Sequence, residues 1–366
     1  MTVVVTGARG FIGQNLVRHL AERGHAVVAI GSDSPESELL SALRQADLVL
    51  HLAGVNRPPS EEAFVTGNVD FTRTLCEGLA AAGRMTPVIF SSSIQAGLEN
   101  AYGRSKRAAE DLLLAYSATG APVRIFRLAN VFGKWARPDY NSVVATFCHN
   151  TARGLDIAVH DPGATLNLVH IDDVCSAFLA LVEEPFSGGA FAEAGPVYRT
   201  TVGEVADAIR AFAASRETLM TDRVGAGLTR ALYSTYLSYL EPAAFAYDVP
   251  RHGDERGVFV EMLKTPDCGQ FSYFTAGPGV TRGQHYHHTK TEKFLVLTGR
   301  ARFGFRHIIT GETVHLETEG GQGQIVETIP GWTHDITNIG DSEMVVMLWA
   351  NEVFDRVRPD TIAMKV

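Results

Sequence analysis

Cysteines are few in this sequence, and no two of them are close together. The four, Cys76, Cys148, Cys175 and Cys268, are spread over 366 residues, whereas zinc ribbons and disulfide frameworks need cysteines at short, regular intervals. We therefore expect neither, and reduced thiols in a cytoplasmic protein are the plain interpretation. The sequence also lacks an apolar run of the roughly 20 residues that span a membrane. Its first residues have no basic flank or long apolar core, so we expect no signal peptide.

Basic residues are in deficit: 32 Lys and Arg stand against 41 Asp and Glu, which gives a formal net charge of −9. Binding to a nucleic acid polymer needs clustered Lys and Arg, so this charge argues against that class of partner. It leaves a small anionic ligand possible if local donors hold it. Hydrophobic residues at 45% and charged residues at 20% are typical of a globular protein and exclude a disordered or collagen-like chain.

The hydrophobic pattern changes near residue 245. Before this point, short apolar runs at 3–5, 26–30, 48–52, 87–90 and 123–126 alternate with helical patterns. This alternation predicts an α/β fold with a doubly wound parallel sheet. After about residue 256, short β-rich runs separated by Gly-containing turns predict an all-β barrel or jelly roll. We expect one domain over residues 1–245 and a second over residues 250–366.

A glycine-rich turn directly follows the first predicted strand. It reads Thr6-Gly-Ala-Arg-Gly-Phe-Ile-Gly13 and opens a predicted helix over residues 12–23. Glycines allow a tight turn and close approach of a ligand, and the helix N-terminus favours a pyrophosphate through its free N–H groups. The residues predicted to bind a dinucleotide are Gly7, Arg9, Gly10, Phe11, Ile12 and Gly13. The alternative is a glycine-rich turn without a ligand.

The identity of the dinucleotide depends on the end of the second strand. NAD-binding units usually place a carboxylate there for the ribose hydroxyls, but this strand ends Ala29-Ile-Gly-Ser-Asp33. The carboxylate is therefore missing or displaced to Asp33. Arg9 offers a guanidinium to a 2′-phosphate, which favours NADP(H); alternatively, Arg9 points to solvent.

A tyrosine and a lysine lie four residues apart, at Tyr102 and Lys106, and so share one face of a predicted helix. An unperturbed tyrosine has a pKa of about 10 and is a poor acid or base at neutral pH. The neighbouring ammonium and a positively charged nicotinamide ring are expected to lower this pKa. Ser91-Ser-Ser93, after the strand at 87–90, supplies a hydroxyl for a substrate carbonyl.

Together with Arg127-Leu-Ala-Asn-Val-Phe-Gly133, these motifs resemble those of extended short-chain dehydrogenase/reductases, which act on nucleotide sugars. The resemblance implies that Tyr102 donates a proton to the carbonyl oxygen, that Lys106 binds the nicotinamide ribose and that Ser93 orients the substrate. Only eight residues separate Ser93 from Tyr102, fewer than in most extended members. Ser92 is therefore the alternative to Ser93.

A third group of residues predicts a metal site. The spacing of the two cupin motifs is matched by Gly279, His285, His287, Glu292 and Gly299, then by Gly323, Gly331, His334 and Asn338. We expect His285 and His287 on one face of a strand, Glu292 on the neighbouring strand, and His334 from across the barrel. Three imidazoles and a carboxylate suit a divalent metal, with zinc favoured and iron, manganese or nickel also compatible. Histidines in a metal-free cupin are the alternative.

A reductase followed by a cupin resembles the CapF-type enzymes of bacterial capsular polysaccharide synthesis over essentially the whole chain. The matching strings include His51-Leu-Ala-Gly-Val-Asn56, Phe132-Gly-Lys-Trp135, Tyr233-Ser-Thr-Tyr-Leu-Ser-Tyr239, Asp254-Glu-Arg-Gly257-Val-Phe259 and His285-Tyr-His-His-Thr-Lys290. The resemblance implies a homodimer formed through the cupin and a bifunctional enzyme. The cupin would invert carbon 3 of a UDP-4-keto-6-deoxy-2-acetamido sugar. The reductase would then use NADPH to form UDP-2-acetamido-2,6-dideoxy-L-talose, on the route to N-acetyl-L-fucosamine.

The proposed epimerisation needs a base, and the sequence does not assign one. Lys290, His307 and Asp335 are candidates, although each is also compatible with a surface or supporting position. A metal ion acting as a Lewis acid would stabilise the enolate that forms when the proton next to the ketone leaves. Two other functions stay open: a single-activity NAD(P)-dependent sugar-nucleotide enzyme with a structural cupin, and a dinucleotide-sensing regulator without chemistry.

Overall fold

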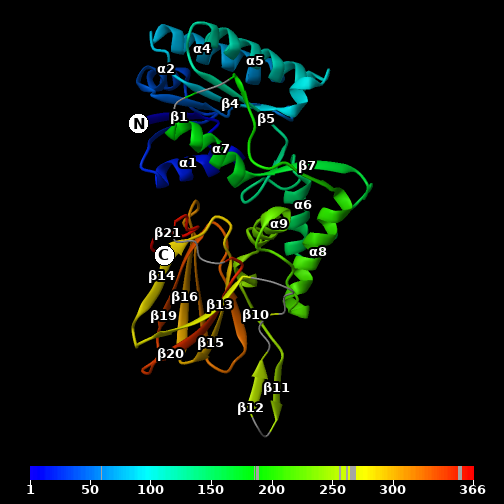
Figure 1. Cartoon of the computed structure of the whole chain (residues 1–366), viewed down its shortest axis with the longest axis vertical. Coiled ribbons are helices and arrows are strands. Elements are labelled where there is room, and N and C mark those ends of the chain that lie inside the picture. Colours follow the sequence, from blue (N-terminus) through cyan, green and yellow to red (C-terminus); the bar gives the residue numbers. More distant parts are fainter. Residues whose placement is uncertain are drawn as a thin grey trace. The chain divides into compact units, whose positions relative to one another are not determined.

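The computed structural model describes residues 1–58, 60–184, 186, 189–254, 257–260, 263, 269–352 and 357–366. Cys268 and the Glu255-Arg256 part of one quoted string lie outside the described residues. The chain forms two compact units (Figure 1). The first unit contains residues 1–131 and 167–199, and the second contains residues 132–166 and 200–366. Cys76, Cys148 and Cys175 are free thiols.

The first unit is built on a six-stranded parallel sheet in the order β2-β1-β3-β4-β5-β8. Its strands are β1 (Thr2–Thr6), β2 (Ala26–Ile30), β3 (Leu48–His51), β4 (Val88–Ser93), β5 (Val123–Leu128) and β8 (Phe191–Ala192). After β1 the chain turns to one side for β2 and then to the other for β3. Ligands of such sheets bind at this switch point, outside the carboxyl ends of the strands.

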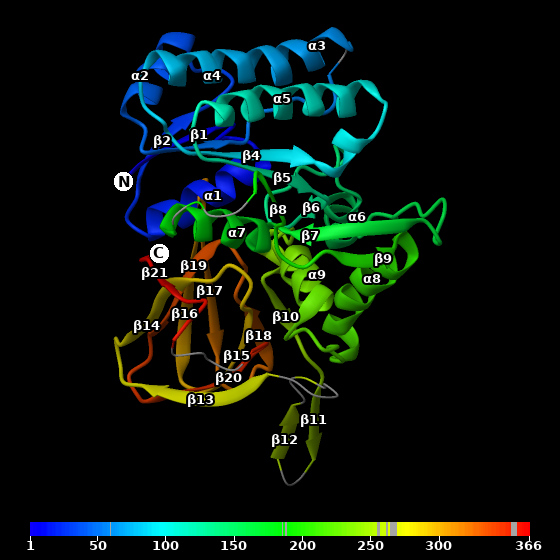
Figure 2. The same cartoon turned by 45° about the horizontal axis from the view of Figure 1, so that its top comes forward.

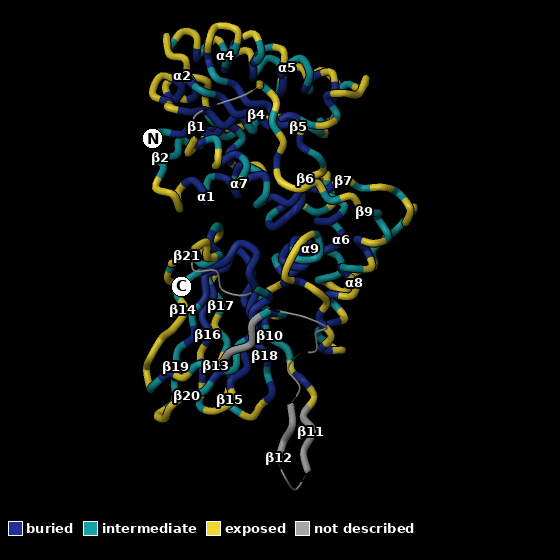
Figure 3. The backbone as a smooth tube through the Cα atoms, in the orientation of Figure 1, coloured by how far each residue is buried: buried dark blue, intermediate teal, exposed yellow. Residues whose placement is uncertain are grey.

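Helices cover both faces of this sheet (Figure 2). On one face lie α1 (Phe11–Glu22) and α7 (Ile171–Glu183), and on the other α2 (Glu36–Gln45), α4 (Phe71–Ala81) and α5 (Ala101–Ala118). Val3 and Val5 of β1 pack in the core beneath α1 and α7, whereas Val4 packs in the core on the opposite face. Successive strand residues therefore serve two cores, which explains the nearly continuous apolar runs and the buried strands of Figure 3. Before α4 the chain forms a short helix, α3 (Glu62–Phe64), and a π-helical segment, η1 (Val65–Asp70).

The second unit contains a β-barrel of two five-stranded sheets, in the orders β10-β18-β15-β20-β13 and β17-β16-β19-β14-β21. The paired strands are antiparallel, as expected for a jelly-roll cupin. The first sheet contains β10 (Ala246–Asp248), β13 (Gln270–Ala276), β15 (Glu292–Thr298), β18 (Gln324–Glu327) and β20 (Met344–Ala350). The second contains β14 (Thr281–Tyr286), β16 (Arg300–His307), β17 (Thr313–Glu319), β19 (Trp332–Asn338) and β21 (Ile362–Ala363). A separate hairpin pairs β11 (Arg251–Asp254) with β12 (Gly257–Val260).

Three helices, α6 (Val143–Ala152), α8 (Val202–Thr218) and α9 (Gly227–Leu237), belong to the second unit with the barrel. Arg216 of α8 lies 3.5 Å from Glu327 of β18, and Glu327 also pairs with buried Lys293 of β15. Tyr233 and Tyr236 of α9 pack on Phe212 of α8. These contacts join the helices to the barrel, so the compact units divide the chain differently from the predicted ranges 1–245 and 250–366.

A small sheet of β6 (Asn130–Phe132), β7 (Thr165–His170) and β9 (Tyr198–Thr201) contains the three places where the chain passes from one unit to the other. None of the helices that the structure describes has the length and apolar character needed to traverse a bilayer.

Candidate active sites

The glycine-rich turn lies between β1 and α1, at the switch point of the parallel sheet. Gly7 has a φ of +66°, and a Cβ there would lie 2.7 Å from the Ala53 nitrogen beyond β3. A Cβ on Gly13 would lie 2.2 Å from the Gly7 oxygen. Both positions thus require glycine. Helix α1 begins after Gly10 without a side-chain cap and with no acidic residue in its first turn, so the N–H groups at Phe11 and Ile12 face no carboxylate of their own turn.

Arg9 and Asp33 meet at the end of β2. Arg9 Nη1 lies 2.6 Å from Asp33 Oδ2, and their side chains are 74% and 60% exposed. The Asp33 carboxylate and the Arg9 guanidinium therefore both lie beside Gly31. A Cβ added at Gly31 would be 2.8 Å from Asp33 Oδ1 and 3.3 Å from Arg9 Nε. An ion pair this exposed contributes little to stability because water screens it. Either partner is therefore free to exchange the other for a ligand.

Ser93, Tyr102 and Lys106 come together at the carboxyl end of β4 and the first turns of α5. Asn100 caps this helix by accepting the Gly103 N–H at 2.7 Å. Gly103 permits the close approach of the helix to the preceding segment, because a Cβ there would lie 2.3 Å from the Gln95 oxygen. The Ser93 side chain is close enough to the Tyr102 phenol to lower its pKa, and Lys106 Nζ donates to the Ser91 carbonyl oxygen at 2.8 Å.

The neighbouring hydroxyl, Ser92, has a different partner. Ser92 Oγ donates to Glu110 Oε1 at 2.5 Å, and both residues are buried. Between the two serines left open by the sequence, the geometry therefore places Ser93 beside Tyr102 and directs Ser92 away from it.

Burial sets the protonation of the tyrosine and the lysine. It raises the pKa of Tyr102, and the neighbouring Ser93 side chain opposes this rise. The expected lowering is thus wrong in sign for the protein alone, because the desolvation of the phenol was not visible in the sequence. Burial also lowers the pKa of Lys106 to about 8, against the opposing charge of Glu110.

Glu110 is a supporting residue that the sequence motifs do not single out. Its carboxylate accepts from Arg127 Nε at 3.0 Å and Nη2 at 2.6 Å, in addition to Ser92. The bidentate pair joins α5 to β5, and the Ser92 hydrogen bond joins α5 to β4. The available signal was spacing, since Glu110 follows Lys106 by four residues and so lies one turn further along the same helix face.

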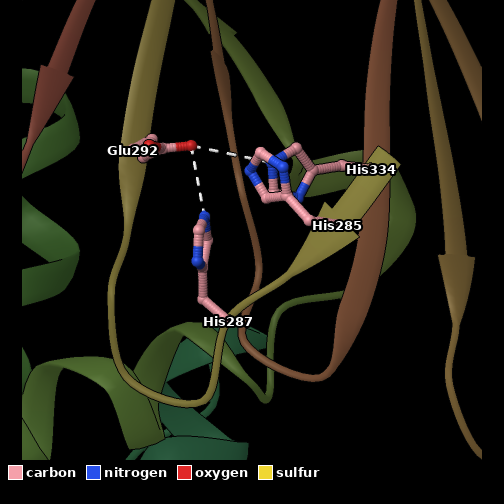
Figure 4. Close-up of side chains that lie close together, drawn as sticks. All are labelled: His285, His287, Glu292 and His334. Carbon is pink, nitrogen blue, oxygen red and sulfur yellow. Dashed lines mark hydrogen bonds and ion pairs between the residues drawn. The ribbon is translucent and has the colours of Figure 1, made fainter. Parts of the chain in front are cut away.

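The four predicted metal donors converge inside the barrel of the second unit (Figure 4). One ligand atom from each of His285, His287, Glu292 and His334 falls within 4.8 Å of the others. Glu292 Oε2 lies 3.3 Å from His287 Nε2 and 3.6 Å from His334 Nε2. His287, Glu292 and His334 are buried, and His285 is partly buried.

The strands that supply these donors differ from the expectation. His334 of β19 stands opposite His285 of β14 in a directly paired register, whereas Glu292 begins β15 in the other sheet. Glu292 therefore reaches across the barrel and His334 is the neighbour, the reverse of the prediction. Strand order in a barrel depends on long-range pairing, which motif spacing does not reveal.

The donor set fits a divalent metal ion. Burial, then the nearby His334 and His287, lowers the pKa of His285 to about 4, and burial likewise lowers that of His334. Burial alone would raise the pKa of Glu292, but the imidazoles of His287 and His334 beside it hold this pKa well below its ordinary value. Neutral imidazoles and an ionised carboxylate are the forms that bind metal. Both ring nitrogens of His334 are buried without a hydrogen-bond partner. A bond to a metal ion would satisfy one of these buried polar atoms.

Only one of the three candidate bases touches this donor set in the part of the chain that the structure describes. Lys290 Nζ lies 2.8 Å from Glu292 Oε1. Asp335 follows His334 in β19, so its side chain points to the opposite face of the strand. There its Oδ1 would lie 2.8 Å from a Cβ added at Gly304. His307 packs edge-on against Trp332 and Trp135.

Comparisons with known proteins agree with both halves of this description. Residues 3–193 match the NAD dependent epimerase/dehydratase family, and residues 252–362 match the polysaccharide biosynthesis C-terminal domain. The capsular polysaccharide assembling protein CapF of Staphylococcus aureus has a solved structure that is 39% identical, with a TM-score of 0.68 and full coverage of both chains. The chain belongs to the CapF-type family.

Other relatives place this CapF-type chain among sugar-nucleotide enzymes. A Pseudomonas aeruginosa protein described as UDP-2-acetamido-2,6-beta-L-arabino-hexul-4-ose reductase is 55% identical over 100% of this chain and 99% of its own length. A UDP-N-acetyl-alpha-D-glucosaminuronate decarboxylase from Bacillus cytotoxicus is 26% identical over 50% of this chain and 72% of its own. Similarity to the decarboxylase covers half of this chain, whereas similarity to the reductase and to CapF covers all of it.

Proposed function

We propose that this chain is a bifunctional enzyme acting on a UDP-4-keto-6-deoxy-2-acetamido sugar. The barrel inverts carbon 3, and the first unit then reduces the carbon-4 ketone to give UDP-2-acetamido-2,6-dideoxy-L-talose, on the route to N-acetyl-L-fucosamine. One observation carries the proposal: each unit contains its own complete set of converging polar side chains. Ser93, Tyr102 and Lys106 lie in the first unit, and the four metal donors lie in the second.

In the reductase site, the residues provide a proton and hold the reacting groups. Bound NADPH would supply the hydride to carbon 4. Tyr102 is assigned to donate its phenolic proton to the ketone oxygen, and burial keeps this phenol protonated because its pKa is raised. Ser93, whose side chain lies beside the Tyr102 phenol, is assigned to orient the same oxygen, and the Lys106 ammonium is assigned to bind the nicotinamide ribose.

The preference for NADPH is supported by Arg9. Its guanidinium is exposed, lies at the end of β2 and is held only by the exposed Asp33 among its described partners. A 2′-phosphate carries more charge than the Asp33 carboxylate and offers more acceptor oxygens. We therefore assign Arg9 to the 2′-phosphate of NADP(H).

In the barrel, His285, His287, Glu292 and His334 are assigned to bind one divalent cation, with zinc favoured. A cation there would act as a Lewis acid and make the proton next to a substrate carbonyl more acidic. Lys290 is the candidate for moving that proton, since it is the one that reaches the donor set. The carbon-3 proton leaves from one face of the sugar and a proton returns to the other face, so no net oxidation accompanies this step.

A paired assay tests the two activities. The UDP-4-keto sugar is incubated in deuterated buffer while NADPH oxidation is followed by absorbance and carbon-3 exchange by NMR, for wild type, Tyr102→Phe and His285→Ala. We expect Tyr102→Phe to lower NADPH oxidation by about 10²- to 10⁴-fold and to keep the exchange. We expect His285→Ala to lose the exchange, and NADPH oxidation with it, because the reductase then lacks its substrate.

The rival function is a single-activity reductase whose barrel is structural. It predicts that His285→Ala oxidises NADPH at the wild-type rate on the same sugar and that the wild type does not exchange the carbon-3 proton. Either result would overturn the bifunctional proposal. The homodimer and the cytoplasmic location stay predictions.

A further inference from the structure

A carboxylate near the C-terminus lies against the loop that separates two of the metal donors. Asp360 Oδ1 accepts the His288 N–H at 2.8 Å, and Asp360 Oδ2 accepts the N–H groups of Thr289 and Lys290, each at 2.7 Å. Thr289 Oγ1 also donates to Asp360 Oδ2, at 3.1 Å. Three consecutive backbone N–H groups thus face one anion. This loop directly follows His287 and ends at Glu292.

The main chain of Asp360 also contacts a metal donor. His287 Nδ1 forms a hydrogen bond with the Asp360 carbonyl oxygen. A neutral imidazole that donates from Nδ1 carries its lone pair on Nε2. His287 Nε2 is the atom that faces Glu292, 3.3 Å from its Oε2. The same residue therefore sets both the tautomer and the direction of the ring.

The segment around Asp360 is itself anchored to the strands that carry the other histidines. In β21, Ala363 stands opposite His285 and Ile362 opposite Tyr286 of β14. The Met364 N–H donates to the Gln284 carbonyl at 2.8 Å, and the Met364 carbonyl accepts from Thr333 Oγ1 of β19 at 2.5 Å. Asp360 is thus held in place from β14 and β19, and holds the 288–290 loop in turn.

We propose that Asp360 is a positioning residue of the metal centre. Its carboxylate fixes the 288–290 loop between His287 and Glu292, and its carbonyl keeps His287 Nε2 directed at the other donors. The proposal rests on the metal site assigned under the proposed function and does not depend on the reaction. Partners that orient a metal-binding histidine in this way change metal affinity by about 10- to 100-fold when they are removed.

Metal binding by the full-length, metal-stripped protein tests this role without any activity assay. Zinc affinity is measured by competition with a chromogenic chelator, and the visible absorption of the cobalt(II)-loaded protein reports donor geometry. Asp360→Asn replaces one carboxylate oxygen with an N–H₂ group, which cannot accept the backbone N–H groups of the 288–290 loop. We therefore expect about 10- to 100-fold weaker zinc binding and an altered cobalt spectrum. Asp341→Asn is the matched control at an exposed turn position, and wild-type values are expected for it.

The outcomes separate three cases. If the wild type takes up neither zinc nor cobalt, the assigned metal centre fails, and this inference with it. If the wild type binds zinc and Asp360→Asn has the same Kd and cobalt spectrum with only a lower melting temperature, Asp360 is merely structural and the inference alone is overturned. Should Asp360→Asn not fold, Thr289→Ala removes the Oγ1 bond to Asp360, together with the bond that this oxygen accepts from Arg230, and about two- to tenfold weaker zinc binding is expected. An unchanged Kd in that variant overturns the inference as well.

Discussion

At the scale of single residues, the local motifs were informative because their chemistry depends on short spacings. Tyr102 and Lys106 lie in the first turns of α5, as the helix period requires, and Ser93 ends β4 beside the Tyr102 phenol. The glycine positions coincide with the tight contacts of the turn. Protonation was not predictable in the same way. The pKa of Tyr102 moves up because the phenol is buried, and burial is set by residues far away in the sequence.

Cofactor choice is also decided at this scale. Replacing Arg9 with Gln removes the exposed guanidinium but keeps a polar side chain. If Arg9 binds the 2′-phosphate, the KM for NADPH rises by about 10- to 100-fold, since a charge-assisted hydrogen bond contributes about 1.5–3 kcal/mol, while the KM for NADH stays near the wild-type value. Steady-state kinetics with both cofactors measures this. Arg44→Gln, at an exposed position of α2, is the control, and an equal change for NADPH and NADH would rule the assignment out.

At the scale of elements, helices and strands of the first unit follow from their hydrophobic patterns, but the contacts that fix them in register do not. The pair between Glu110 and Arg127 connects α5 to β5 across 17 residues of sequence, and no motif contains both. For the same reason the prediction for the barrel was wrong about two donors: His334 lies on the strand next to that of His285, and Glu292 lies in the opposite sheet. Pairing between distant strands is a property of the folded chain and leaves no local pattern.

The lowered pKa of Lys106 predicts that reductase activity depends on pH. Lys106 is buried, lies 4.4 Å from the centre of the Phe90 ring and is also faced by His51, which burial keeps neutral by lowering its pKa to about 3. With a pKa of about 8, the ammonium is charged below pH 8 and loses its proton as the pH rises through that value. We therefore expect kcat/KM to fall on the alkaline side, near pH 8.

Glu110→Gln removes the opposing charge that raises the pKa of Lys106, so this alkaline limb is expected at lower pH. Ser92 and Arg127 also lose an ionised partner, at a cost of about 1–3 kcal/mol in unfolding free energy. A pH–rate profile and a urea titration measure the two effects. The control is Glu99→Gln, since Glu99 is an exposed carboxylate that pairs with Arg107. A profile that keeps its position in Glu110→Gln would show that Glu110 acts on stability alone.

At the scale of the whole molecule, the sequence predicted two kinds of fold, but contacts within the second unit determine which segments belong together. Trp135 lies against Gly331, where a Cβ would be 2.9 Å from its ring, and Tyr239 of the helical part hydrogen-bonds Ala136. A segment that follows the Arg127–Gly133 motif thus packs beside the second cupin motif. A boundary drawn from composition marks where the hydrophobic pattern changes and carries no information on which distant segments pack together. The domain ranges 1–245 and 250–366 stay a prediction.

Because the four assigned metal donors lie in the second unit and the dinucleotide turn lies in the first, metal removal is expected to stop epimerisation without weakening NADPH binding. Chelation of the folded protein should abolish carbon-3 exchange and leave the Kd for NADPH, measured by fluorescence titration, within about twofold of its starting value. Re-addition of zinc should restore the exchange. Exchange that continues at full rate in the chelated, still-folded protein would remove the metal from the proposed mechanism.

The same separation predicts that the two activities can be supplied by different molecules. His285→Ala keeps Ser93, Tyr102 and Lys106, and Tyr102→Phe keeps all four metal donors, so each variant lacks a different step. If the epimerised ketone leaves the barrel before it is reduced, an equimolar mixture of the two should oxidise NADPH at least about tenfold faster than either alone. Mixtures at several enzyme concentrations, with Tyr102→Phe/His285→Ala as the matched inactive partner, measure this. A mixture no faster than its components would mean that the intermediate does not pass between molecules, and that the two sites must act within one protein.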